Sequence, residues 1–138
     1  LQNIDVQIDT IRKQHSVAKE NLLKQAAVLD RLRREAGAKL ERQIQAHLHD
    51  LGMTSAKFAV VIETNNVLNE LGMNQIMFLF SANQGEEPRA LNKVASGGEL
   101  SRIALAIKAV NAGKSETKSM VFDELDAGIG GKTAQMVA

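Results

Sequence analysis

Two neighbouring acids, Asp123 and Glu124, are the residues of this chain best placed to do chemistry. They follow an apolar run, Met120–Phe122, that is typical of a buried central strand. In α/β proteins ligands bind at the carboxyl ends of such strands. Asp123 there would suit Mg²⁺, which prefers oxygen ligands, and Glu124 could accept a proton from an attacking water. A polar exit from a strand would explain the same pair if nothing else supported it.

The segment Ser96–Glu99, "SGGE", supplies that support. Ser96 and Glu99 have the spacing of a capping box, in which the two residues satisfy amides at a helix start. Capping does not explain Gly97 and Gly98, because each glycine costs a helix about 1 kcal/mol relative to alanine. Bare amides at the positive end of a helix instead favour an anion, with Ser96 as a further donor.

Two other segments look like phosphate-binding P-loops but fail the pattern Gly-x-x-x-x-Gly-Lys-[Ser/Thr]. Gly131–Thr133 has Asp126 where the first glycine is needed, and Gly113–Ser115 has Lys108 there. A carboxylate facing phosphates would oppose binding, and its Cβ would hinder the close approach of the backbone. The 138 residues therefore contain no P-loop.

Taken together, these segments resemble parts of ABC-type ATPases. Ser96–Glu99 resembles the signature motif, Met120–Glu124 the Walker B strand with its catalytic glutamate, and Asp126–Gly128 the D-loop. The runs "KVASGGELSRIALAIKAV" and "VFDELDAGIGGKTA" resemble the RecN family of bacterial DNA-repair proteins, relatives of the SMC proteins. Ala95 stands where most ABC proteins have leucine, as it does in RecN-like proteins. The resemblance covers most of residues 51–138 and implies an α/β fold, the truncated C-terminal lobe of an ABC/SMC-type ATPase head.

The resemblance also implies roles for single residues, with ATP and Mg²⁺ as cofactors. The signature residues would contact ATP held by a second head, Asp123 would hold Mg²⁺, and Glu124 would activate water. Asp126 would belong to the loop that crosses the interface between heads. The residues expected to contact the nucleotide are Ser96, Gly97, Gly98, Glu99 and Asp126.

The implied partners are DNA at double-strand break ends, a second ATPase head in a homodimer, and the N-terminal Walker A lobe of the same full-length protein. A cytoplasmic, nucleoid-associated location without a membrane partner goes with them. The 138 residues alone are expected to be inactive, because Walker A is absent. Two alternatives stay open: a non-enzymatic coiled-coil interaction module, and the head lobe of another SMC-like ATPase.

Residues 1–50 predict the element that would connect such a head to its partners. They contain no proline and one glycine, Gly37, and would extend roughly 75 Å as one helix. Positions spaced by four and three predict a coiled-coil arm whose partner helix lies elsewhere. After Ala36 the spacing shifts, which predicts a local change of supercoil. The seam comprises Ile4, Ile8, Ile11, His15, Ala18, Leu22, Gln25, Leu29, Leu32 and Ala36, then Leu40, Ile44, Leu48 and Leu51.

A basic cluster on the same helix could be a solvated face, the favoured interpretation, or a stripe that contacts DNA. It consists of Arg31, Arg33, Arg34, Lys39 and Arg42.

Residues 51–138 predict a small α/β lobe. Strands are expected at Lys57–Glu63 and Gln75–Ser81, connected through Asn65, Asn66 and Gly72. A loop over 81–89 and a helix from Ser96 to near Gly113 would follow, then a strand at 119–122 and a helix from Lys132. The expected apolar face of the first helix is Leu100, Ile103, Ala104, Ile107 and Val110.

Bulk composition adds three limits. The net charge of +1 argues neither for nor against nucleic acid. The absence of cysteine excludes disulfides and thiolate metal sites. No apolar run approaches the roughly 18 residues of a membrane span. The chain begins without Met and stops inside a predicted helix, so we expect it to be part of a longer protein.

Overall fold

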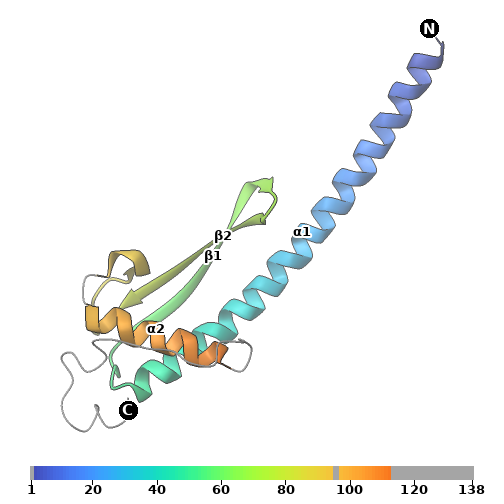
Figure 1. The fold of residues 1–138 in the computed structure, drawn as a ribbon. Helices are drawn as coiled ribbons and strands as arrows, with labels where there is room; N and C mark the ends of the chain where they lie inside the picture. Colours follow the sequence, from blue (N-terminus) through green and yellow to red (C-terminus); the bar gives the residue numbers. More distant parts are fainter. Residues whose placement is uncertain (1, 95–96, 113–138) are drawn as a thin grey trace. The chain divides into compact units, whose positions relative to one another are not determined.

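The computed structural model describes residues 2–94 and 97–112, which combine two helices with a small antiparallel sheet (Figure 1). In chain order the elements are α1 (Gln2–Asp50), β1 (Lys57–Asn69), β2 (Gly72–Ser81), β3 (Arg89–Ala90), a 3-10 turn η1 (Leu91–Lys93) and α2 (Gly97–Asn111). The fold is therefore mixed α and β, as expected. The strand expected at 119–122 and the helix expected from Lys132 lie outside the described residues.

The sheet has the order β1-β2-β3. β2 and β3 are antiparallel, with Leu79 opposite Ala90 and Phe80 opposite Arg89. β1 and β2 are joined by two residues and run in opposite directions as a hairpin (Figure 1).

The chain divides into two compact units. One comprises Leu1–Glu35 with Glu63–Gln75, and the other comprises Ala36–Ile62 with Ile76–Ala138. α1, β1 and β2 each contribute residues to both units. The predicted boundary between an arm at 1–50 and a lobe at 51–138 stays a prediction.

A glycine cap ends α1. Gly52 has φ +77, its amide donates to the carbonyl of His49 at 3.0 Å, and the amide of Met53 donates to Leu48 at 2.9 Å. This bonding pattern is a Schellman motif, which satisfies carbonyls that the helix leaves open. The C-terminus of α1 is therefore capped.

The hairpin is longer than predicted. Asn65 and Asn66 lie inside β1, so placing the connection there is wrong. The turn follows Asn69, whose Oδ1 accepts a hydrogen bond from the Leu71 amide at 2.8 Å. Gly72 then begins β2 with φ +97, a backbone conformation that favours glycine. Polar strand residues carry weak propensity, and docking on α1, described below, explains why the pairing continues past them.

The shifted part of the predicted seam packs into the protein's own core. Ile44 and Leu48 are fully buried and Leu51 is nearly so, within the second unit. They pack with Phe58 of β1, and the remaining core members are Ala56, Phe80, Ile103 and Ala106. The change of spacing after Ala36 therefore coincides with the point from which this face of α1 packs against the protein's own core. The predicted local change of supercoil does not describe this difference in packing.

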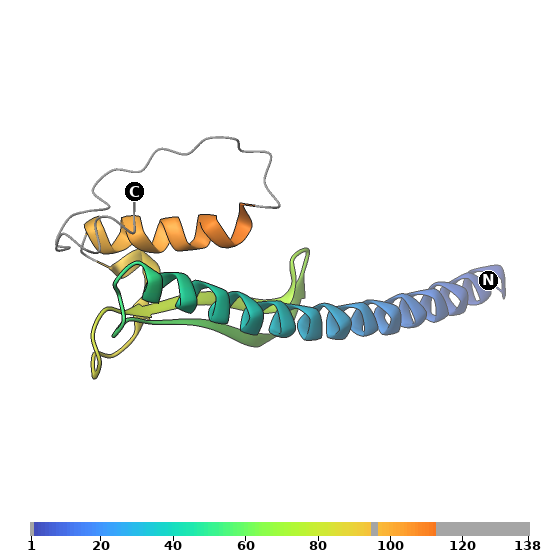
Figure 2. The ribbon, with the colours of Figure 1, turned by 90° about the horizontal axis from the view of Figure 1, so that it is seen from below.

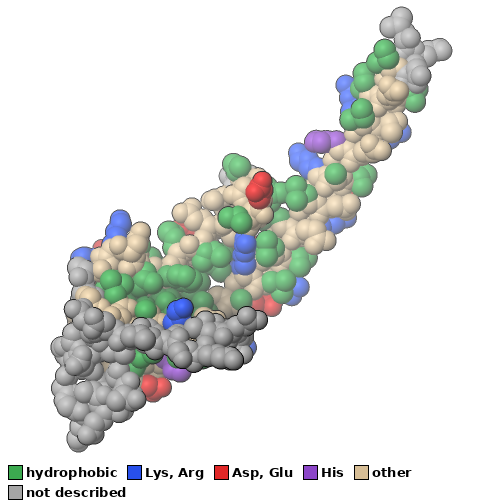
Figure 3. All heavy atoms as spheres, in the orientation of Figure 1, with side chains coloured by type: hydrophobic (Ala, Val, Ile, Leu, Met, Phe, Trp, Pro, Cys, Tyr) green, Lys and Arg blue, Asp and Glu red, His purple; other side chains and the backbone are tan. Residues whose placement is uncertain are grey.

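The first part of the seam is exposed in the structure. Ile4 is 56% exposed, Ile11 63% and Leu22 53%. Hydrophobic side chains recur along this stretch of α1 in Figure 3. Pairing of this face with a second helix stays a prediction.

None of the helices in the described residues is long and apolar enough to cross a membrane.

Candidate nucleotide-contacting site

The first turn of α2 contains three of the predicted site residues. α2 begins at Gly97, directly after Ser96, so the helix starts where the sequence predicted. Gly97 is exposed, Gly98 is buried and Glu99 is half-buried. Amides in the first turn of a helix have no acceptor within the helix, and the aligned peptide dipoles give this end a partial positive charge of about 0.5. The arrangement can therefore receive an anion such as a phosphate.

The body of α2 is fixed by the core of the second unit. Ile103 is 1% exposed and Ala106 is fully buried, in one cluster with Ile44 and Leu48 of α1. Figure 2 shows α2 alongside the C-terminal turns of α1. The direction of α2, and with it the direction of its first-turn amides, is therefore set by burial of apolar surface.

The buried face of α2 differs from the predicted one. Ala104 and Leu100 are exposed, the latter by 37%, while Arg102 is buried with 7% exposed. The prediction assigned the buried face from apolar periodicity alone. In the structure the buried face is shifted, because the small Ala106 packs closely in the cluster that contains Ile44 and Leu48 of α1. Including Leu100 and Ala104 in the core was wrong, and omitting Ala106 was too.

β3 and η1 precede this helix in the chain. β3 pairs with β2, and η1 follows at once. The Val94 amide donates to the Leu91 carbonyl at 3.3 Å, and Val94 leaves η1 in an extended conformation. β3 contains one cation, Arg89, and η1 contains another, Lys93.

The other predicted site residues lie outside the described part of the chain. They are Ser96, Asp123, Glu124 and Asp126, and both P-loop-like segments also lie there, at 113–115 and 131–133. How the signature residues and the two acids lie relative to one another therefore stays a prediction. Within 2–94 and 97–112, no three His, Asp or Glu side chains gather as a metal site would require.

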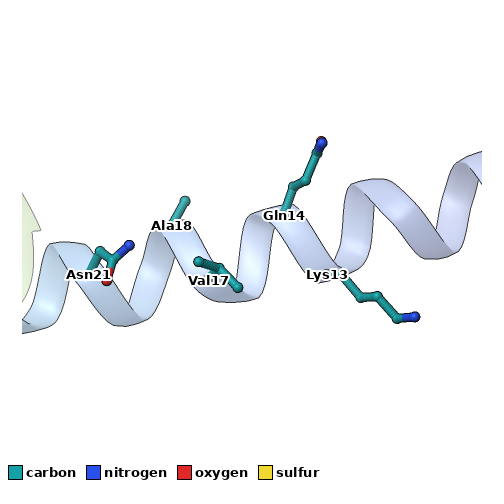
Figure 4. A pocket seen from close by; sticks show the side chains of 5 residues that line it. All are labelled: Lys13, Gln14, Val17, Ala18 and Asn21. Carbon is teal, nitrogen blue, oxygen red and sulfur yellow. The ribbon is translucent and has the colours of Figure 1, made fainter.

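A surface hollow on the N-terminal half of α1 does not have the features of a ligand site. The hollow in Figure 4 lies on α1 alone and is lined by Lys13, Gln14, Val17, Ala18 and Asn21. The side chains of Lys13 and Gln14 point to opposite sides of the helix. Polar groups that do not converge cannot fix the orientation of a ligand.

Most side chains of the basic cluster on α1 bind other residues of the same chain. Arg31 pairs with Glu35 at 3.2 Å, and Arg34 pairs with Asp30 at 3.0 Å. Arg33 donates to the Asn74 side chain at 3.2 Å. These pairings favour the interpretation as a solvated structural face over a stripe that contacts DNA.

Sequence reasoning missed the side chains that join α1 to the hairpin. In the first unit, Asp30 accepts hydrogen bonds from Asn74 at 2.6 Å and Thr64 at 3.3 Å. In the second unit, Glu41 and Gln45 bind the backbone of β1. The only sequence signal for Glu41 and Gln45 was that two polar residues lie four positions apart next to Ile44. Such a pair is common on helices.

Comparison with known proteins finds relatives that share one description. The chain is 45% identical over 114 residues to "DNA repair protein RecN" of Treponema pallidum, covering 78% of this chain. It is 34% identical to the protein of that name from Vibrio cholerae over 96% of this chain, and 31% identical to the one from Bacillus subtilis over 100% of this chain. The chain spans 20%, 24% and 27% of these relatives, respectively. No protein-family model matches the chain.

Proposed function

The chain belongs to the RecN family, and on that premise we propose that it is part of an ATPase that acts in DNA double-strand break repair and recombination. The chain supplies the signature motif, the Walker B strand and the D-loop of an ABC-type head. The Walker A lobe and the rest of the protein come from sequence beyond these 138 residues. The relatives are named as DNA repair proteins, and this supports the repair role.

One observation carries the nucleotide part of the proposal: a 15-residue helix begins at Gly97 with its body locked into the core. A fixed helix start with an exposed glycine gives amide donors that need no rearrangement to meet phosphate oxygens. A free surface helix would lose much of this advantage, because its orientation would have to be fixed on binding.

The proposed division of labour follows the sequence motifs. Ser96, Gly97 and Gly98 contact the terminal phosphate of ATP held by a second head, and Glu99 supports their turn. Bound Mg²⁺ neutralises charge on the phosphates, and Asp123 is the residue that would hold it, mostly through water. Glu124 orients and deprotonates the attacking water.

Asp126 acts at the interface between the two heads. ATP joins the heads and hydrolysis releases them. The exposed seam of α1 would pair with another helix and pass this change to DNA ends. DNA contact is not assigned to the basic cluster of α1, because Arg31 and Arg34 have acidic partners.

Substitution of Ser96 tests the trans contact. In the full-length protein, Ser96→Arg should abolish ATP-dependent pairing of heads, because the long side chain fills the phosphate position. The control is Asn92→Arg, which adds the same charge at an exposed position of η1. Pairing is measured by light scattering with and without ATP. Normal pairing of the Ser96 variant would contradict the model.

The exposed seam equally suits a non-enzymatic interaction module. The two functions differ in what precedes Leu1 in the gene. A Gly-x-x-x-x-Gly-Lys-[Ser/Thr] segment after a predicted strand supports the split ATPase head, and its absence from the whole coding sequence supports the interaction module.

A further inference from the structure

Two side chains of α1 bind the open edge of the sheet. Among the strands of residues 2–94 and 97–112, β1 lies at the edge of the sheet, so within this part of the chain one side of its backbone has no strand partner. Gln45 accepts from the Phe58 amide at 3.0 Å and donates to the Ala56 carbonyl at 2.7 Å. Glu41 accepts from the Val60 amide at 2.8 Å. The helix thus takes the hydrogen-bonding place of a further strand.

The spacing of the two elements makes this possible. Four residues of helix advance about 6 Å, and two residues of strand advance about 6.6 Å. Gln45 and Glu41 are four apart, and the amides of Phe58 and Val60 are two apart on one edge. The bonded residue of β1 moves from 58 to 60 as the bonded residue of α1 moves from 45 to 41, so the two elements run antiparallel.

The two residue types specify one register between helix and strand. At its position Gln45 must both accept and donate, and an amide side chain can do both. Glu41 needs only to accept, which a carboxylate does. A slip of one helical turn would place Glu41 against the Ala56 carbonyl, so that two acceptors face each other. The same slip would bring Gly37, which has no side chain, to the amide of Val60.

Gly37 allows the strand to come this close. A Cβ at Gly37 would lie 3.0 Å from Cδ1 of Ile62 and 3.2 Å from Cγ1 of Val60. Gly37, Glu41 and Gln45 therefore present three different surfaces to β1 at successive turns. Their order distinguishes the observed register from its neighbours.

We propose that Glu41 and Gln45 are positioning residues that set the axial register of α1 on β1. α1 also shares its core with α2, through Ile44 against Ile103 and Ala106 in the same unit. The register therefore fixes where α1 lies relative to the first turn of α2. Resting on the proposed function, the consequence is that the signature helix and this part of α1 move as one body when ATP joins the heads.

A designed disulfide measures the register directly. The 138 residues contain no cysteine, and a Cβ at Gly37 would lie 3.7 Å from Cβ of Val60, which is within the disulfide range of about 3.5–4.5 Å. The full-length protein is prepared with Gly37→Cys, Val60→Cys and Ile62→Val, so that the two side-chain atoms nearest the added Cβ, Cγ1 of Val60 and Cδ1 of Ile62, are removed, and any cysteine outside this chain is replaced by serine. The rate of disulfide formation under mild oxidation is followed by mass spectrometry.

Four further substitutions on this background separate register from general stability. Gln45→Glu removes the donor for Ala56 and should slow disulfide formation about tenfold. Glu41→Gln keeps an acceptor and should stay within about twofold of the parent. Ile44→Val loosens the core without touching these bonds, and Gln43→Glu adds charge at an exposed site; both should stay near the parent. A Gln45→Glu variant as fast as the parent, or an Ile44→Val variant as slow as Gln45→Glu, would overturn the proposal.

Hydrogen exchange gives a second measurement in protein without the added cysteines. Peptides covering residues 56–61 should exchange about tenfold faster in Gln45→Ala and Glu41→Ala, because the amides of Phe58 and Val60 lose their acceptors. Glu41→Gln should restore protection, which a general loss of packing would not do. Unchanged protection in both alanine variants would overturn the proposal.

The last arm tests the consequence for turnover. Full-length protein with the disulfide closed should hydrolyse ATP within about twofold of the same protein after reduction. Loss of turnover on oxidation and its recovery on reduction would overturn the claim of one moving body. Absence of turnover in the unmodified protein would instead overturn the proposed function, while the disulfide rates still decide the register.

Discussion

Asp30 is the residue on which the docking of the hairpin tip depends. Its carboxylate accepts two hydrogen bonds from Arg34 at 3.0 Å, one from Asn74 at 2.6 Å and one from Thr64 at 3.3 Å. These hydrogen bonds lower the pKa of Asp30 below its ordinary value of 3.8, and the bonds from Arg34 contribute most, with that from Asn74 second. One short side chain thus joins α1 to both strands of the hairpin within the first unit.

Acid should release this contact. Because the pKa of Asp30 is lower in the folded protein than in the unfolded chain, its contribution to stability is complete above pH 3.8. That contribution is lost as the pH falls through the folded pKa below that value. Peptides covering residues 63–75 should accordingly lose protection from hydrogen exchange at low pH.

Asp30→Asn should weaken the same protection already at neutral pH and remove its acid dependence. Asp9→Asn is the matched control, because Asp9 is 72% exposed and lies 3.9 Å from Arg12. An Asp30→Asn protein with the acid response of the parent would contradict the assignment.

Single residues were predictable only where a local rule applied. Gly97–Glu99 at a helix start follow a motif of four consecutive residues, and the structure begins α2 there. Gln45 could not be found in this way, because its partners Ala56 and Phe58 come from tertiary docking of a strand. The N–H of an edge strand can be bound by any side chain that carries an acceptor and reaches it, so the sequence leaves the choice open.

At the scale of elements, periodicity predicted α1 but not its packing partners. Apolar residues three or four apart include both exposed Leu22 and buried Ile44. An apolar stripe records that something covers it and leaves open whether that is another helix or the protein's own sheet. The strands were also recognised from local propensity, while their extension to Asn69 depends on contacts with α1.

Gly72 and Gly85 form a matched pair for testing the hairpin turn. Both have positive φ, +97° and +85°, so alanine at either should cost about 1–2 kcal/mol in backbone strain. A Cβ at Gly72 would also lie 3.0 Å from Cδ2 of Leu29, whereas nothing lies within 4 Å of one at Gly85. Gly72→Ala should therefore lower the thermal midpoint more than Gly85→Ala and speed exchange over 63–75. Equal effects of the two substitutions would show that the hairpin does not press against α1 at this point.

For the whole molecule, the proposed ATPase function requires a Walker A lobe in addition to this chain. It spans 20–27% of the RecN relatives compared above and contains no P-loop. The purified 138 residues should therefore show no ATP hydrolysis above background, because nothing in them grips the triphosphate. Phosphate release at saturating ATP and Mg²⁺ measures this, with full-length protein as the positive control. Robust turnover by the short chain would refute the assignment of its motifs.

Glu124 should separate the joining of heads from their release. In the full-length protein, Glu124→Gln keeps the size of the side chain and one acceptor oxygen but removes the proposed base that activates water. Hydrolysis should fall by about 10²–10⁴-fold, the usual contribution of a general base. ATP binding should persist, since the substitution alters neither the proposed Walker A lobe nor the proposed phosphate contacts of Ser96–Gly98, so paired heads should accumulate.

Glu87→Gln is the control for that substitution, because Glu87 is an exposed carboxylate in the loop before β3. Phosphate release and light scattering on the same samples give turnover and pairing together. Loss of both would indicate that Glu124 supports the interface or the fold, and unchanged turnover would remove it from catalysis. Loss of turnover with retained pairing is the combination expected if the first acid after the strand serves the metal and the second serves the water.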